Sequence, residues 1–167
     1  LHLVSACDIR NNFDGIRKSI DKIGSASIMM ELLGAVMQPE DKNEEIFDLA
    51  LTGLQELETS INPDKVTTIF KIKMLSLSGF KPHFDSCVSC MDRIMGQSKF
   101  SLSRGGLLCP RCMTKDPGSR SIFRGTIATV LHIERNNFAT SLNLGMNPQI
   151  RKELGLEIGS SVLVTKM

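Results

Sequence analysis

Four cysteines in two closely spaced pairs are the residues of this chain with the clearest chemical potential. Cys87 and Cys90 are separated by two residues, as are Cys109 and Cys112, and 18 residues lie between the pairs. Two thiolates at this spacing can reach one ion from a tight turn, and two such turns supply the four sulfurs of a tetrahedral Zn²⁺ site. The distance between the pairs is typical of a zinc ribbon. We therefore predict one structural zinc ion, because four sulfur ligands leave no open position for a substrate.

Two disulfides, a redox-active dithiol or buried free thiols are the alternatives for these cysteines. The chain shows no secretory signal, so we expect a reducing compartment, in which disulfides rarely persist. Paired spacing of this kind rarely arises from core packing, and zinc is the interpretation that we favour. Cys7 stands apart from both pairs and is predicted to be a bystander.

One stretch resembles part of an enzyme motif. His132-Ile133-Glu134 has the H-x-E pattern of zinc deaminases, which take their other ligands from P-C-x-x-C. Here the order is reversed and both cysteine pairs are already used, so we expect His132 at the surface or against a neighbour and Glu134 paired with a cation. The sequence contains no Walker loop, Rossmann fingerprint or G-x-S-x-G. We predict a protein that is not an enzyme.

Charge is divided unevenly along the chain, although the net charge is only +2. Residues 1–64 contain 5 basic and 12 acidic side chains, whereas residues 65–167 contain 15 and 6. This asymmetry predicts a basic face for a polyanion, although two halves that attract each other within one fold would give the same counts. The basic surplus around the cysteines exceeds what four thiolates and Zn²⁺ require, so phosphates are the expected partner. The candidate DNA contacts are Lys81, Arg93, Lys99, Arg104, Arg111 and Lys115.

Aromatic side chains that could stack on nucleic-acid bases are few. The chain contains no Trp and no Tyr, so phenylalanine alone could provide a stacking surface. Phe80, Phe84, Phe100 and Phe123 lie in or beside the basic region, and we expect at least half of them to be core residues.

Apolar residues at helical spacing predict helices on both sides of the cysteines. Asn12, Asn43 and Asn62 are the expected N-caps of three of them, because an Asn side chain accepts a hydrogen bond from a first-turn amide. The helix after Asn62 is apolar on more than one face, which predicts a central position. Gly24 and Ser25 are expected to interrupt the first helical stretch. The expected helices cover residues 12–23, 28–36, 43–57, 62–77, 122–131 and 147–154, and residues 160–164 are expected to be a strand or an ordered tail.

We therefore predict a mainly α fold, a helical bundle with an inserted four-cysteine zinc ribbon. The ribbon should contain a short β hairpin, with Gly105 and Gly106 permitting positive φ at its turn. Hydrophobic residues make up 41% and charged residues 23%, as in globular proteins, and no apolar run could span a membrane. The chain opens at Leu1 within an apolar stretch, so we expect a segment upstream. The predicted division is a strand remnant of a preceding domain at 1–10, a helical domain at 11–80, the ribbon at 81–118, and C-terminal helices at 119–167 that pack back on the helical domain.

The order of these motifs resembles the carboxy-terminal region of the RecO family of bacterial recombination mediators. The likeness covers roughly residues 10–118 and is most specific in its central part. Acidic helices upstream with Ile46-Phe47 and Leu54–Leu57 add to it. The residues that carry it are Phe70–Pro82, the two cysteine pairs, Phe100-Ser101 and Gly105-Gly106-Leu107-Leu108.

The resemblance implies a cytoplasmic, nucleoid-associated bacterial protein of recombinational DNA repair, with no membrane partner. Family members bind single- and double-stranded DNA, anneal complementary strands, and work with RecR and the single-stranded-DNA-binding protein to load RecA. The implied fold is an amino-terminal OB barrel followed by a helical domain with a zinc ribbon, and residues 1–6 would be the barrel's last strand. The alternative is a zinc-ribbon protein-interaction module of transcription or RNA machinery.

Overall fold

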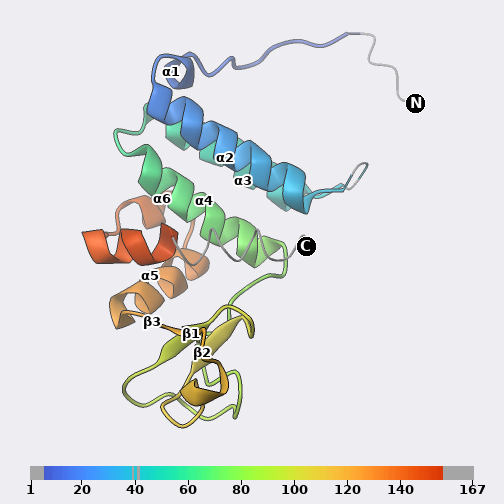
Figure 1. Ribbon diagram of the computed structural model, residues 1–167. Coiled ribbons are helices and arrows are strands. Elements are labelled where there is room, and N and C mark those ends of the chain that lie inside the picture. Colours follow the sequence, from blue (N-terminus) through green and yellow to red (C-terminus); the bar gives the residue numbers. More distant parts are fainter. Residues whose placement is uncertain (1–5, 39, 41, 156–167) are drawn as a thin grey trace.

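The computed structural model describes residues 6–38, 40 and 42–155, and its helices lie in layers around α4 (Figure 1). The elements are α1 Asp14–Arg17, α2 Ile20–Val36, α3 Glu44–Thr59, α4 Pro63–Leu77, β1 Lys99–Ser101, β2 Gly106–Leu108, the 3₁₀ helix η1 Met113–Lys115, β3 Arg120–Ser121, α5 Arg124–Arg135 and α6 Phe138–Leu142. Helices α2 and α3 contact α4 on one side, and α5 and α6 contact it on the other. The small sheet lies beyond α5, so the predicted mainly α fold with an inserted β hairpin is confirmed. No helix in the described part of the chain has the length and apolar character needed to cross a membrane.

Helix α4 lies at the centre of the helical layers, as predicted from its apolar character. Asn62 caps it by accepting a hydrogen bond from the Lys65 amide at 3.1 Å, and Pro63 occupies the first turn, where no amide is needed. Phe70 of α4 is fully buried against α3. A Cβ on Gly53 would lie 2.9 Å from the Phe70 ring, so this glycine lets the two helices approach closely. Close packing at the centre of the core therefore requires the large Phe70 side chain and a glycine at position 53.

The beginning of the helical region differs from the prediction. Helix α2 runs without a break through Gly24 and Ser25, and the chain instead turns at residues 18–19. A glycine inside a helix costs only about 1 kcal/mol, which the burial of Met29 and Leu32 on this helix outweighs. The expected Asn12 cap is also wrong, because Phe13 precedes α1 with a φ of 50° and its amide donates to the Asn11 side chain.

The C-terminal part returns to the helical core. Helix α5 confirms most of the predicted 122–131 helix and extends beyond it, and residues 148–155 form a helix that Asn147 caps at the Ile150 amide. The short helix α6 was not predicted; the Asn137 side chain accepts from the Thr140 amide at its start. Lys73 of α4 donates to the Ile133 and Asn136 carbonyls at the end of α5. The expectation for residues 160–164 lies outside the described residues.

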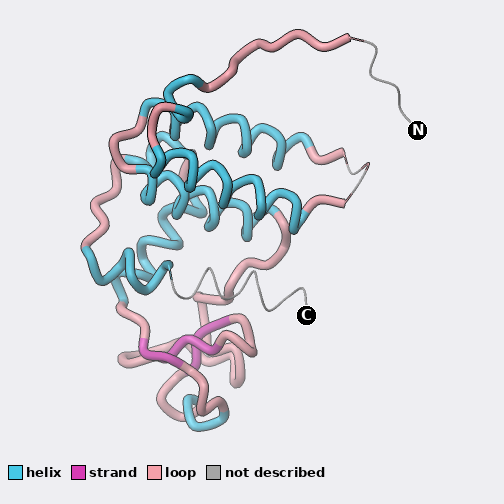
Figure 2. Tube along the Cα trace, turned by 45° about the horizontal axis from the view of Figure 1, so that its top comes forward, coloured by secondary structure: helices cyan, strands magenta, loops and turns pink. Residues whose placement is uncertain are grey.

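The β hairpin of the cysteine region is confirmed and has a third strand. Strands β1 and β2 are antiparallel, and β3 pairs with the other edge of β1 (Figure 2). Gly105 has the positive φ expected at the turn, at 64°, whereas Gly106 has a different role. A Cβ on Gly106 would lie 2.8 Å from the His83 carbonyl oxygen, so glycine is needed there for close approach of two chain segments. The predicted domain boundary at residue 118 stays a prediction; β3 lies just after it.

Glu153, near the C-terminal end of the described chain, caps the start of α5. Its carboxylate accepts from the Phe123 amide at 3.0 Å and from the Thr126 hydroxyl at 2.6 Å. Burial opposes the charged form, but these bonds and one from Gln149 outweigh it and lower the pKa of Glu153 below its ordinary 4.5. Stability from this carboxylate is therefore complete above pH 4.5 and is lost as the pH falls through the lower folded pKa.

We expect Glu153→Gln to lower the free energy of unfolding at pH 7 by about 1 kcal/mol, because hydrogen bonds to a partly exposed carboxylate are screened by water. The deficit relative to wild type should shrink as the pH falls below 4.5, as measured by urea titrations at several pH values. Glu31→Gln, an exposed carboxylate on α2, is the control and should change stability by less than about 0.5 kcal/mol. A deficit that is constant with pH would contradict the capping role.

Candidate metal centre and its basic surroundings

The four cysteines of the two pairs come together at one point. Their sulfur atoms all lie within 4.8 Å of one another, and the Sγ atoms of Cys90 and Cys109 are 3.7 Å apart. Zinc–sulfur bonds of about 2.3 Å in a tetrahedron place sulfurs about 3.8 Å apart, so this spacing fits a metal ion. All four cysteines are free, and Cys87, Cys109 and Cys112 are buried. The group could therefore hold one metal ion with four sulfur ligands.

Each cysteine pair lies in the same kind of tight turn. The Met91 amide donates to the Cys87 carbonyl at 2.8 Å, and the Met113 amide donates to the Cys109 carbonyl at 3.0 Å. The two turns face each other, because the Cys109 amide also donates to the Cys87 sulfur at 3.4 Å. The sequence therefore folds locally into two tight turns, each closed by the carbonyl of its first cysteine, that converge on one point.

Backbone amides and neighbouring sulfurs act in opposite directions on the thiols. Burial disfavours the Cys87 thiolate, but amides of residues 89, 90 and 109 outweigh it and lower the pKa of Cys87 to about 6. For Cys90, the Asp92 amide favours the thiolate, but burial and the three other sulfurs outweigh it and raise the pKa of Cys90 to about 12. The protein alone therefore supports one thiolate readily and opposes the next, so four thiolates together require a cation. Metal affinity at such a site falls with falling pH, because protons compete for the sulfurs.

Met91, which follows the first pair, occupies a backbone conformation that suits glycine. Its φ is 61° and its side chain is 68% exposed, so the residue has strain without compensating burial. We expect Met91→Gly to raise the free energy of unfolding of this region by up to about 1 kcal/mol, since glycine tolerates positive φ. Denaturant titration of the metal-loaded chain measures the change.

Met95→Gly is the matched control for this prediction. Met95 is 77% exposed in the same loop, but its φ is not positive, so glycine should only increase the entropy of the unfolded chain. The control should therefore leave stability unchanged or lower it. Equal effects of the two substitutions would contradict the strain at Met91.

Three of the six basic candidates have partners within the protein. The Lys81 ammonium lies 3.0 Å from a carboxylate oxygen of Glu134 on α5, which confirms the expectation that Glu134 pairs with a cation. Arg111 pairs with Asp92, and Lys115 donates to the Ser89 hydroxyl at 3.2 Å. Nearby Asp92 and the sulfurs of Cys109 and Cys90 raise the pKa of Arg111. These charges hold the cysteine region together and attach it to α5.

The other three basic candidates, Arg93, Lys99 and Arg104, present their charges outward. Arg93 and Arg104 are exposed and Lys99 is partly exposed. Within the described residues, none of these side chains makes a hydrogen bond or an ion pair within 4.0 Å. The Ser101 hydroxyl chiefly, and Arg104 more weakly, lower the pKa of Asp116. These three side chains remain accessible to a partner with phosphate groups.

The H-x-E stretch does not contribute to the metal centre. The sulfur cluster contains neither His132 nor Glu134, and the Glu134 side chain is 4% exposed beside Lys81. Cys7 is exposed and also lies outside the cluster. The arrangement thus separates the H-x-E pattern from the cysteines that a zinc deaminase would require beside it.

Two aspartates that the sequence reasoning missed support the centre. Asp92 accepts the Cys87 amide through its carbonyl at 2.9 Å, while its carboxylate pairs with Arg111 between the other two cysteines. It therefore joins the two turns. Asp116 accepts from the Ser101 and Ser103 hydroxyls and fixes the hairpin turn. The sequence did contain a signal for the Asp92–Arg111 ion pair, because an acidic residue lies beside one cysteine pair and a basic residue lies inside the other.

Comparison with known proteins gives consistent matches. A family model described as Recombination protein O C terminal matches residues 17–159. A DNA repair protein RecO from Acetivibrio thermocellus is 25% identical over 156 residues, which cover 93% of this chain and 62% of that protein. One from Caldicellulosiruptor saccharolyticus is 33% identical over 112 residues, covering 67% and 46%, and one from Dehalococcoides mccartyi is 29% identical over 152 residues, covering 90% and 60%.

The matched region is a part of these longer relatives, because the chain spans between 46% and 62% of their lengths. The family model covers both the helical layers and the four-cysteine region, so the match includes the elements that build the candidate site. The chain therefore belongs to the RecO family of DNA repair proteins, in the region that the family model describes as carboxy-terminal.

Proposed function

We propose that this protein is a non-enzymatic recombination mediator that binds single- and double-stranded DNA through the basic surface around its metal ribbon. The observation that carries the proposal is the group of accessible basic side chains, Arg93, Lys99 and Arg104, beside four converging cysteines in a RecO family chain. Phosphate groups are the anions that such a surface suits, since contacts to the backbone position a protein without reading sequence.

The cysteines would hold one structural Zn²⁺. Four sulfur donors at tetrahedral spacing favour zinc among the common divalent metals, and a closed coordination sphere supports a structural role. When bound, the ion supplies the charge that lets all four thiols ionise together. Cys87, Cys90, Cys109 and Cys112 would then fix the two turns at either end of the segment that carries Arg93, Lys99 and Arg104.

The six basic candidates would interact with DNA in two ways. Arg93, Lys99 and Arg104 are free to contact DNA phosphates, while Lys81, Arg111 and Lys115 would add long-range attraction from positions fixed by Glu134, Asp92 and Ser89. Attraction of this second kind is screened over about 8–10 Å at physiological salt.

Protein partners would use another surface. A groove of about 780 Å³ between α2 and α3 is lined mainly by apolar residues, among them Phe47 and Met30, which are 66% and 42% exposed, together with Glu44 and Asp48. We propose that the protein works in the cytoplasm, near the nucleoid, with RecR and the single-stranded-DNA-binding protein to promote RecA loading and strand annealing. In the proposed division, residues 1–10 end a preceding OB-type domain, 11–80 form the helical domain, 81–118 the zinc ribbon and 119–167 the C-terminal helices.

The salt dependence of DNA binding tests the proposal. The logarithm of the binding constant of the zinc-loaded chain for a labelled single strand should fall linearly with the logarithm of the salt concentration. Arg93→Gln, Lys99→Gln or Arg104→Gln should each lower the steepness of this slope by about 0.7. Lys18→Gln, at an exposed position in the acidic half, is the matched control and should leave the slope unchanged. Absent or salt-insensitive binding would favour the protein-interaction alternative from transcription or RNA machinery.

A further inference from the structure

A second groove lies on the cysteine region, beside the hairpin turn. It has a volume of about 650 Å³, within the range of roughly 300–1,000 Å³ that small-molecule sites occupy. One wall is formed by residues 79–83, which connect α4 to the cysteines, and the other by residues 102–105 of the hairpin turn. Phe100 of β1 also lines it. This hairpin groove therefore lies between two segments of the proposed DNA-binding surface.

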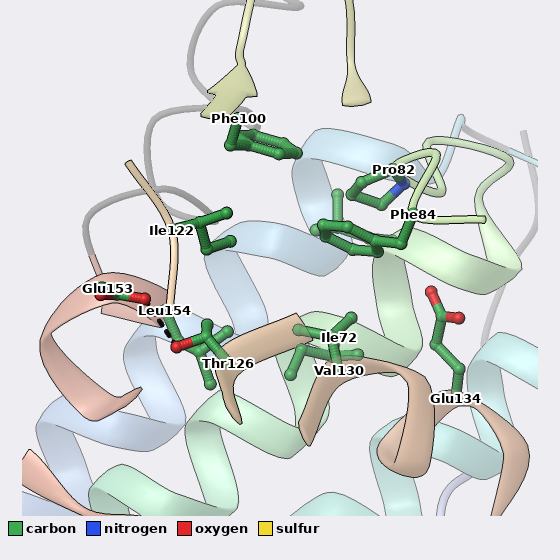
Figure 3. A pocket seen from close by; sticks show the side chains of 11 residues that line it. Ile72, Pro82, Phe84, Phe100, Ile122, Thr126, Val130, Glu134, Glu153 and Leu154 are labelled. Atoms are coloured by element: carbon green, nitrogen blue, oxygen red, sulfur yellow. Dashed lines mark hydrogen bonds between the residues drawn. The ribbon is translucent and has the colours of Figure 1, made fainter. Parts of the chain in front are cut away.

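The hairpin groove displays an aromatic ring to solvent. Phe80 is 51% exposed, whereas Phe100 is 4% exposed and its ring lies 5.7 Å from that of partly buried Phe84. Figure 3 shows Phe84 and Phe100 facing the apolar cavity that adjoins this region, between the sheet and α5. Phe84 and Phe100 are thus used for packing, whereas Phe80 and Phe123, the latter 42% exposed, keep exposed rings, and of these two only Phe80 lines the hairpin groove.

The two walls of the hairpin groove are fixed to each other by backbone hydrogen bonds. The His83 amide donates to the Gly105 carbonyl at 2.8 Å, and the Leu107 amide donates to the His83 carbonyl at 3.0 Å. Gly106 permits this approach, since a Cβ there would collide with the His83 carbonyl. A groove with fixed walls loses little entropy when a ligand enters.

The charge of the hairpin groove favours a polyanion. Lys81 and Arg104 line it, and none of its lining residues within the described part of the chain is acidic. The Lys81 side chain remains 51% exposed although it pairs with Glu134. The groove between α2 and α3 differs in this respect, because Glu44 and Asp48 line it. An exposed aromatic ring between basic side chains is the combination that binds single-stranded nucleic acid.

We propose that the hairpin groove binds an unpaired base of single-stranded DNA, which stacks on Phe80 while Arg104 contacts a flanking phosphate and Lys81, held beside Glu134, attracts the strand. The inference rests on the proposed function and gives it a strand preference. Bases of a duplex are already stacked on their neighbours, so only a single strand can offer a base to Phe80 without disrupting pairing.

Substitution of Phe80 tests this proposal. We expect Phe80→Ala to weaken binding of the zinc-loaded chain to labelled oligo-dT by about tenfold or more, the loss typical of one stacked base. The salt slope and the affinity for duplex DNA should not change, because no charge is removed. Phe80→Trp should restore binding, whereas Phe80→Leu, which keeps apolar volume without a ring, should not. A base-free deoxyribose-phosphate strand should bind wild type and Phe80→Ala equally.

Phe47→Ala is the matched control, because Phe47 is 66% exposed but lies in the groove that carries Glu44 and Asp48. It should leave oligo-dT binding within about twofold of wild type. Salt-dependent binding by wild type with Phe80→Ala and Phe80→Leu both unimpaired would overturn the stacking site and leave the proposed function standing. No binding of oligo-dT by wild type would overturn both. Equal zinc content and melting temperature of the Phe80 variants exclude misfolding as the cause.

Discussion

Cys109→Ser should abolish the proposed zinc binding and unfold the four-cysteine region, while the helices around α4 remain folded. Cys109 is 5% exposed, its sulfur lies 3.7 Å from that of Cys90, and its amide donates to the Cys87 sulfur. The buried cluster of this region consists of three cysteines and Leu108, and the apolar side chains packed against it, Val88, Ile94 and Met113, are only partly buried, so the metal would replace most of a buried core. Zinc binding to such sites supplies about 10–16 kcal/mol of apparent free energy at pH 7, which a weaker oxygen ligand cannot preserve.

Zinc content and two structural signals measure this outcome. Wild type should contain one zinc per chain and Cys109→Ser close to none, while far-ultraviolet circular dichroism retains its helical signal. Amide hydrogens of β1 and β2 should exchange rapidly in the variant, because their strands belong to the ribbon.

Cys7→Ser is the matched control for loss of a thiol. Cys7 is exposed and outside the sulfur cluster, so the zinc content and the exchange rates should stay at wild-type values. One zinc per chain and an unchanged melting profile in Cys109→Ser would show that the cysteines are not the metal ligands.

Local signals in the sequence were sufficient for several parts of the fold. The caps at Asn43 and Asn62 depend on atoms within three residues, and the structure has both. The two cysteine turns likewise depend on a spacing of two residues. Features that depend on distant packing were not predictable in this way: α2 continues through Gly24 because burial of its apolar side chains outweighs the local preference, and β3 exists because β1 has an edge to pair with.

The same distinction between local signals and distant contacts applies to the candidate site. The convergence of two cysteine pairs followed from their spacing, whereas the fate of each basic side chain depended on residues far away in sequence. Lys81 pairs with Glu134 of α5, and Arg111 pairs with Asp92 across the two turns. A count of charges cannot separate these two cations from Arg104, which has no such partner within the described residues. Charge composition therefore predicts a basic region and not the individual contacts.

Phe70→Ala should have the opposite effect to the cysteine substitution: it should destabilise the helices and leave the zinc in place. Phe70 is fully buried, and its ring packs at Gly53 of α3, beside the Met29 side chain of α2. Truncation would leave a cavity where three helices meet, and such substitutions cost about 3–5 kcal/mol. That loss is a large fraction of the roughly 5–15 kcal/mol by which domains are stable. Denaturant titration followed by circular dichroism measures it.

Phe47→Ala separates the loss of packing from the loss of an aromatic residue. Phe47 also lies on α3 but is 66% exposed, so its truncation should change the free energy of unfolding by less than about 0.5 kcal/mol.

Together, Cys109→Ser and Phe70→Ala test whether the four-cysteine region and the helical core unfold independently. The four-cysteine region contacts the helices through the Lys81–Glu134 ion pair and through side chains around an apolar cavity, among them Phe84 and Val130. Because this contact is small, we expect two unfolding transitions, one that depends on zinc and one that depends on Phe70. A single transition that both substitutions shift equally would mean that the metal centre and the helical core unfold as one unit.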